Sequence, residues 1–124
     1  MNHQHILNMD PEKLVEWLKD EFLIDVPEEI ITVEDMNEAA KLLLRLSSSY
    51  SYLCVLLSHA KIAVRALKRG TDKEAIDDMI DRKEAIQNIT DSVKQQYAAI
   101  SRNVTIKIEN NRELQMNSSG YIKQ

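Results

Sequence analysis

A cluster of acidic side chains is the part of this 124-residue sequence that could bind a metal ion. The cluster consists of Asp77, Asp78, Asp81 and Glu84. Carboxylates from facing helices hold Mg²⁺ in all-α nucleotide pyrophosphohydrolases, but that arrangement needs paired acids on both helices. The residues expected opposite this cluster are Ala60, Val64 and their neighbours. We therefore predict no metal site and no catalytic residue here.

The histidines and the cysteine give no stronger indication of catalysis. His3 and His5 are two residues apart and have no third ligand nearby, as a metal site would require. His59 has no serine or carboxylate at a spacing that would orient it as a base. Cys54 is the single cysteine, which indicates a reducing compartment. We expect a non-enzymatic, cytoplasmic protein without a cofactor.

The composition is typical of long helices. The chain has two glycines and two prolines, and 44% of its residues are apolar. These values predict an all-α protein with one domain over residues 1–116 and a flexible tail over residues 117–124. No apolar run approaches eighteen residues and the first residues lack the pattern of an export signal, so we expect no membrane segment.

The longest predicted helix covers residues 33–69. Its apolar residues alternate at spacings of three and four, which is the pattern of a helix that packs along a partner helix in a coiled coil. These seam residues are Met36, Ala39, Leu43, Leu46, Tyr50, Leu53, Leu57, Ala60, Val64 and Leu67. Thr32 and Asp35 can form a capping box at the start. Gly70 is expected to end the helix in a left-handed conformation.

A second long helix follows almost at once. Thr71 and Glu74 have the spacing of a capping box, so a stop signal is followed directly by a start signal. This pattern predicts an antiparallel helical hairpin whose second helix covers residues 72–104. In an antiparallel hairpin, the numbers of two facing residues have a constant sum, which is about 143 here. This register places apolar residues opposite one another in most layers. The alternation of apolar residues after Val104 leaves residues 104–116 open as either helix or strand.

A shorter amphipathic helix is predicted over residues 11–23. Its apolar face consists of Leu14, Trp17, Leu18 and Phe22. Short helices are marginal in isolation, so this helix is expected to dock on the hairpin. Capture of another protein through Trp17 is the alternative.

The first long helix carries a second apolar stripe on another side. The stripe consists of Ser48, Tyr52, Val55, His59, Ile62 and Ala66. A helix that is apolar on two sides needs two neighbours, which indicates self-association, most simply as a two-fold dimer with a four-helix core. The predicted interface consists of Tyr52, Val55, His59 and Ile62. In the alternative arrangement, the N-terminal helix and the C-terminal segment cover this stripe within one chain.

Charged residues gather where the two long helices meet. The net charge of −4 gives no overall attraction for nucleic acid. The basic end of the first helix lies beside acids of the second, and we expect the two groups to neutralise each other. The predicted partner-binding surface consists of Lys68, Arg69, Asp77, Asp78 and Asp81. Its acids could also mimic the phosphates that a nucleic-acid-binding protein recognises.

Two further binding functions remain open. The first is binding of nucleic acid in a basic groove that an oligomer forms from Lys61, Arg65, Arg102 and Lys107. The second is binding of a small nucleotide in a pocket between subunits, where cations and tyrosines from two chains would converge.

Residues 50–70 (YSYLCVLLSHAKIAVRALKRG) and 81–102 (DRKEAIQNITDSVKQQYAAISR) resemble small helical accessory proteins encoded by phages and prophages of low-GC bacteria. The resemblance covers about residues 36–104. It implies a role in host takeover, recombination or the inhibition of host defence. Such proteins bind and block a larger machine or sequester a signalling nucleotide. The resemblance assigns no site residues.

Overall fold

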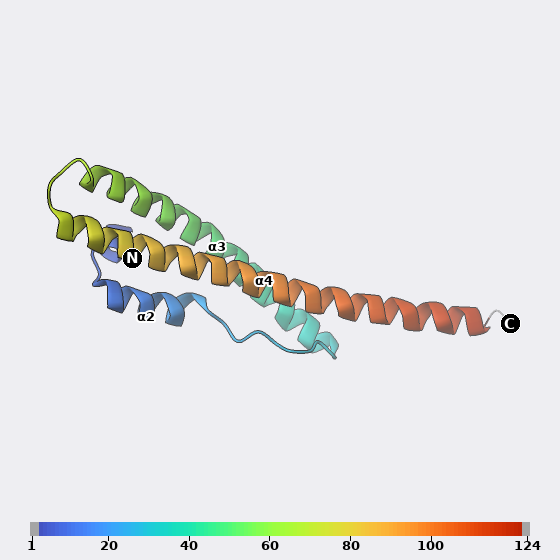
Figure 1. Ribbon diagram of the computed structural model, residues 1–124. Helices are drawn as coiled ribbons and strands as arrows, with labels where there is room; N and C mark the ends of the chain where they lie inside the picture. Colours follow the sequence, from blue (N-terminus) through green and yellow to red (C-terminus); the bar gives the residue numbers. More distant parts are fainter. Residues whose placement is uncertain (1–2, 123–124) are drawn as a thin grey trace.

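The protein consists of four helices that form a long hairpin with a shorter N-terminal layer. The computed structural model describes the backbone of residues 3–122 and the side chains of residues 3–115. The helices are α1 (His3–Leu7), α2 (Pro11–Phe22), α3 (Val33–Leu67) and α4 (Lys73–Ile122). Figure 1 shows α3 and α4 running antiparallel and crossing at an angle. The predicted all-α hairpin with a short N-terminal helix is confirmed.

The start of α3 follows the prediction and its end does not. The Thr32 hydroxyl accepts a hydrogen bond from the Asp35 N–H at 3.0 Å, and the Asp35 carboxylate accepts one from the Thr32 N–H at 2.9 Å. Gly70 is not left-handed, because no described glycine has a positive φ. The helix ends instead in a tightened turn, in which the N–H groups of Arg69 and Gly70 bond to carbonyls three residues back.

Helix α4 begins one residue later than its predicted start at residue 72 and ends later than predicted. The Asp72 carboxylate, rather than Thr71, accepts the capping hydrogen bond, from the Ala75 N–H at 3.1 Å. The helix continues to Ile122, so the predicted end at residue 104 and the strand alternative for residues 104–116 are both wrong. A strand there would need a neighbouring strand for its backbone groups, whereas a helix satisfies them within the segment.

The last turns of α4 extend past the start of α3, as Figure 1 shows. Backbone residues 117–122 belong to this helix. The flexible tail predicted for residues 117–124 includes residues 123–124, which lie outside the described residues, and it stays a prediction. No helix among the described residues is long and apolar enough to cross a membrane.

The seam between α3 and α4 forms the centre of one hydrophobic core. Leu46, Leu53, Ile86, Val93 and Ile100 are fully buried there. Burial of one such side chain stabilises the fold by about 1.5–3 kcal/mol. The core therefore lies on the side of α3 where the spacing of three and four residues places it.

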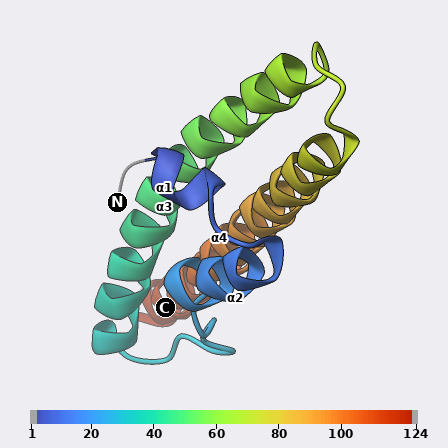
Figure 2. The ribbon, with the colours of Figure 1, turned by 90° about the vertical axis from the view of Figure 1, so that its left-hand side faces the viewer.

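Helices α1 and α2 cover one side of the hairpin. Helix α1 packs on α3 and helix α2 packs on α4, as Figure 2 shows. Leu14, Leu18 and Phe22 bury the apolar face of α2, so the predicted docking within the chain is what the structure contains. Helix α1 was not predicted, and it adds Ile6 and Leu7 to the same core.

Three polar side chains of α4 hold the nonhelical N-terminal segments by hydrogen bonds to their backbone. Arg82 donates to the Met9 carbonyl at 2.8 Å, and Asn103 donates to the Pro27 carbonyl at 2.8 Å. Between them, Gln96 donates to the Ile24 carbonyl at 2.7 Å and accepts from the Ile24 N–H at 3.2 Å. The bonds of Gln96 and Asn103 fix the path of the segment that connects α2 with α3, hereafter the connector (residues 23–32), and the bond of Arg82 holds the segment between α1 and α2.

Candidate functional site

The predicted self-association residues divide into two groups in the structure. Tyr52 is half-buried, and its ring lies 5.8 Å from the Phe22 ring and 5.6 Å from the His3 ring. His59 is exposed and stacks on His3, with ring centroids 4.6 Å apart. Burial raises the pKa of the Tyr52 phenol above its ordinary value. The N-terminal layer therefore takes up one edge of the predicted stripe.

Val55 and Ile62 remain open to solvent. Their exposed fractions are 48% and 59%. Leu44, which the sequence reasoning did not include, is 72% exposed on the same side of α3. Three large aliphatic side chains on one uncovered side of a helix form a candidate interface rather than scattered exposed residues.

These residues belong to a continuous exposed surface on the side of α3 turned away from the core, hereafter the back face. The back face consists of Val33, Asn37, Ala40, Leu44, Ser47, Ser48, Ser51, Val55, Ser58, Ile62 and Ala66, all of them exposed. None of these side chains is charged, although 29% of the residues in the chain are; the exposed Arg65, five turns after Ser47 on the same side of the helix, bounds the surface near its C-terminal end. A solvent-facing side of a helix is ordinarily rich in charge, so this composition indicates a covered surface.

The back face is rotated around the axis of α3 relative to the predicted stripe. Tyr52 and His59 lie at the edge where α1 packs, whereas Leu44, Ser51 and Ser58 lie further from α1 on the helix circumference. A search for apolar side chains alone overlooks the serines. The signal that would have found the back face is the absence of charge at its eleven positions.

The predicted partner-binding residues lie around the tight turn between α3 and α4. Lys68, Arg69, Asp77 and Asp81 are exposed, and Asp78 is half-buried. No ion pair within 4.0 Å joins these residues to one another in the structure. The ion pair found among residues 3–115 is that of Lys41 with Glu38, at 3.3 Å. The expected neutralisation at the turn therefore involves no direct contact.

The four cations of the nucleic-acid alternative do not converge within one chain. Lys61 and Arg65 are near the turn, whereas Arg102 and Lys107 are on the distant half of α4. By the hairpin register, Lys61 lies near residue 82, about 30 Å along α4 from Arg102. A basic groove would therefore require a second copy of the chain.

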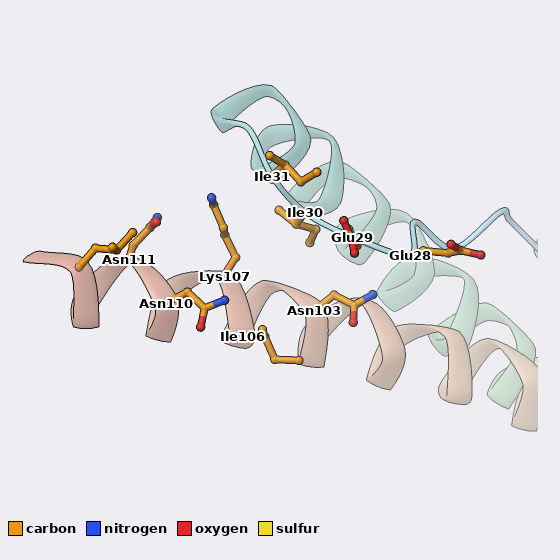
Figure 3. Close-up of a pocket in the computed structure, with 10 residues that line it drawn as sticks. Glu28, Glu29, Ile30, Ile31, Asn103, Ile106, Lys107, Asn110 and Asn111 are labelled. Carbon is orange, nitrogen blue, oxygen red and sulfur yellow. The ribbon is translucent and has the colours of Figure 1, made fainter.

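A groove that was not predicted from the sequence lies between the connector and α4. Its volume is about 540 Å³, and Figure 3 shows Lys107 extending from α4 toward the connector. The lining residues are Glu28, Glu29, Ile30, Ile31, Asn103, Ile106, Lys107, Asn110, Asn111 and Leu114. The groove combines apolar groups with amides and charges of both signs, so its composition favours no single ligand class.

A second, smaller groove of about 220 Å³ opens along the seam beside Tyr50 and Tyr97. Cys54 is half-buried one turn after Tyr50. The hydrogen bond between the two side chains raises the pKa of Tyr50 above its ordinary value. Tyr50 is therefore an uncharged phenol at neutral pH.

Within residues 3–115, no group of three or more His, Cys, Asp or Glu side chains is arranged to hold a metal ion. The chain matches no protein-family model, and no curated protein or solved structure is significantly similar to it. The functional interpretation therefore depends on the surfaces themselves. Of these, the back face of α3 carries three large exposed aliphatic side chains on one side of one helix.

Proposed function

We propose that the protein is a homo-oligomeric helical hairpin that acts by binding and not by catalysis. The observation that carries this proposal is the back face of α3, where Leu44, Val55 and Ile62 are exposed on a surface without charge. Covering such a surface removes apolar area from water, which is favourable at about 25 cal/mol per Å². A second copy of the chain is always available to cover it.

The binding of a different macromolecule is assigned to the turn between α3 and α4. Lys68, Arg69, Asp77 and Asp81 are exposed there, and their charges are not held in direct ion pairs. Such charges can form complementary contacts with a partner and raise the rate of association. As an accessory or inhibitory protein of the cytoplasm, the oligomer would bind its partner through this turn.

Self-association is tested by measuring mass in solution. We expect light scattering at micromolar concentration to give a mass above that of one 14.3 kDa chain. Val55→Asp should lower the mass to that of a monomer, because a carboxylate would be buried without a partner. Ile108→Asp is the matched control, because Ile108 is 45% exposed on α4, away from the back face. A monomeric wild type at these concentrations would exclude the proposal.

Binding assays separate the remaining alternatives. Nucleic-acid binding through an oligomeric groove predicts an affinity that falls steeply with salt, because cations displace counterions from phosphates. A nucleotide pocket between subunits predicts a higher Tm in the presence of the nucleotide. Turnover of a magnesium nucleotide that Asp78→Ala abolishes would exclude a purely binding function.

A further inference from the structure

We infer that two copies of the chain pair through the back faces of α3, antiparallel and related by a two-fold axis at Ser51. This inference rests on the proposed self-association and adds its geometry. In an antiparallel pair with this axis, residue numbers that face each other add up to about 102. The occupant of the back face is therefore the back face of a second copy.

The sequence of the back face is self-complementary in side-chain size around Ser51. Three of the four large aliphatic residues of one copy fall opposite small residues of the other, and the fourth, Val33, faces Arg69 beyond the end of α3. The facing residues are Ile62 with Ala40, Leu44 with Ser58, Val55 with Ser47, and Ser51 with itself. Alternation of large and small residues across an interface lets two helices interdigitate at close distance. No other antiparallel register within α3 places small residues opposite Leu44, Val55 and Ile62 together.

The serines at the centre suit this close approach. Ser47, Ser48 and Ser51 are short, so they let two helix axes lie within the usual separation of about 8–10 Å without a clash at the centre of the pair. The Ser58 hydroxyl already donates to the Cys54 carbonyl of its own helix at 3.0 Å. Covering Ser58 by the partner's Leu44 therefore does not break the hydrogen bond that its hydroxyl donates.

The charges at the two ends of α3 favour an antiparallel pair over a parallel one. The first turn carries Glu34 and Asp35, whereas the last turns carry Arg65, Lys68 and Arg69. An antiparallel pair brings the acidic end of each helix near the basic end of the other. The helix dipoles are also opposed in this arrangement.

Among residues 3–122, no other helix obstructs this pairing. In Figure 2, α1 lies against one side of α3 and α4 against another, and the remaining side is open. His3 and Tyr52 lie at the edge of the back face and not on it. The back face extends over 34 residues, or about 51 Å at 1.5 Å per residue.

The area available agrees with a dimer of moderate affinity. A strip about 51 Å long and about 10 Å wide gives roughly 500 Å² on each partner, or about 1,000 Å² in total. Stable specific interfaces begin near this total. We therefore expect dissociation to be measurable in the micromolar range.

Cysteine crosslinking at the two-fold axis tests the geometry. With helix axes about 10 Å apart, the two Ser51 Cα atoms are about 5 Å apart, within the range that a disulfide spans. In a Cys54→Ser background, Ser51→Cys should therefore form a covalent dimer rapidly under mild oxidation. Ser58→Cys is the matched control, because its two copies would be about 21 Å apart along the axis. It should remain uncrosslinked.

A mixed experiment tests the register independently. Leu44→Cys and Ser58→Cys, each in the Cys54→Ser background, should crosslink with each other more readily than either does with itself. Light scattering of each reduced variant reports whether the noncovalent oligomer is still present. Covalent dimers on a nonreducing gel then report the geometry alone.

The outcomes separate the inference from the proposal on which it rests. If the reduced proteins are oligomers but Ser51→Cys crosslinks no faster than Ser58→Cys, the antiparallel geometry is wrong and self-association remains. If the reduced wild type and all variants are monomers, the antiparallel geometry and the proposed self-association are both wrong. Rapid crosslinking of Ser51→Cys together with the preferred mixed pair supports both.

Discussion

The hydrogen bonds between Gln96 and Ile24 lead to a quantitative prediction about the connector. The Gln96 amide donates to the Ile24 carbonyl at 2.7 Å and accepts from the Ile24 N–H at 3.2 Å. Gln96→Ala removes both bonds and leaves two half-buried backbone groups without their partner. A typical hydrogen bond contributes about 0.5–1.5 kcal/mol net, so we expect a loss of about 2 kcal/mol in the free energy of unfolding.

The assay is urea denaturation followed by helical circular dichroism, with all variants at one protein concentration because self-association would shift the midpoint. A loss of about 2 kcal/mol corresponds to a decrease of roughly 8 °C in Tm for a chain of this size. Gln95→Ala is the matched control, because Gln95 is exposed on the same turn of α4. It should change the free energy of unfolding by less than about 0.5 kcal/mol.

Gln96→Glu distinguishes hydrogen bonding from side-chain volume. A carboxylate can accept from the Ile24 N–H, but it cannot donate to the Ile24 carbonyl and repels it. The variant should therefore be destabilised at neutral pH and recover toward the wild type when acid protonates the new carboxyl group. If Gln96→Ala is as stable as Gln95→Ala, the two bonds contribute nothing and the reasoning about the connector fails.

Two further predictions concern the ends of α3. Hydrogen bonds from the Thr32 and Ile31 N–H groups hold the pKa of Asp35 below its ordinary value of 3.8, so its stabilising effect is fully present above that pH and is lost as pH falls through the lowered pKa. The stability difference between wild type and Asp35→Asn, measured by urea denaturation, should therefore be largest near neutral pH and shrink in acid. A stability difference that does not vary with pH would contradict a stabilising role of the Asp35 carboxylate in the cap. Gly70→Ala should be neutral or stabilising by about 0.4–1 kcal/mol, because Gly70 has no positive φ and alanine restricts the unfolded chain. A new Cβ would lie 3.4 Å from the Leu67 carbonyl oxygen, an ordinary contact, and a marked decrease in Tm would indicate a left-handed Gly70 after all.

The hairpin could be predicted from the sequence because its determinants are local and repeated. A spacing of three and four residues over α3 identifies one buried side without reference to any other segment. The cap at Thr32 and the break at Gly70 then limit the helix to within two residues of its observed end. Because many positions along α3 indicate the same helix, one residue that departs from the pattern does not change the prediction.

The path of the connector over α4 and the presence of helix α1 could not be predicted in this way. The bond between Gln96 and Ile24 joins residues 72 positions apart, and the bond between Arg82 and Met9 joins residues 73 apart. No periodic pattern relates such residues, since each bond depends on where the folded hairpin places one side chain. Helix α1 has five residues, and it is held by the burial of Ile6 and Leu7 rather than by its own propensity.

The end of α4 shows how context overrides a local preference. Val104, Ile106 and Ile108 alternate with polar residues, as in a half-buried strand. Ile106 and Ile108 are instead 48% and 45% exposed on a helix. Their β-branched side chains favour strands only where a sheet offers neighbours, and no strand is present among residues 3–122. Continuing the existing helix adds one backbone hydrogen bond for each residue without a new nucleation step.

The back face of α3 required both the sequence and the structure. The apolar pattern predicts a second interface on α3, but it cannot tell that α1 occupies the edge at Tyr52 and His59. Once that edge is assigned, the uncovered part is centred on Ser51, where hydrophobicity is low and charge is absent. Serine tolerates both water and close packing, so a surface of this kind can remain soluble in the monomer and still fit a second copy. Such a composition is expected of an interface that forms and dissociates, in contrast to the permanently buried seam on the opposite side of the same helix.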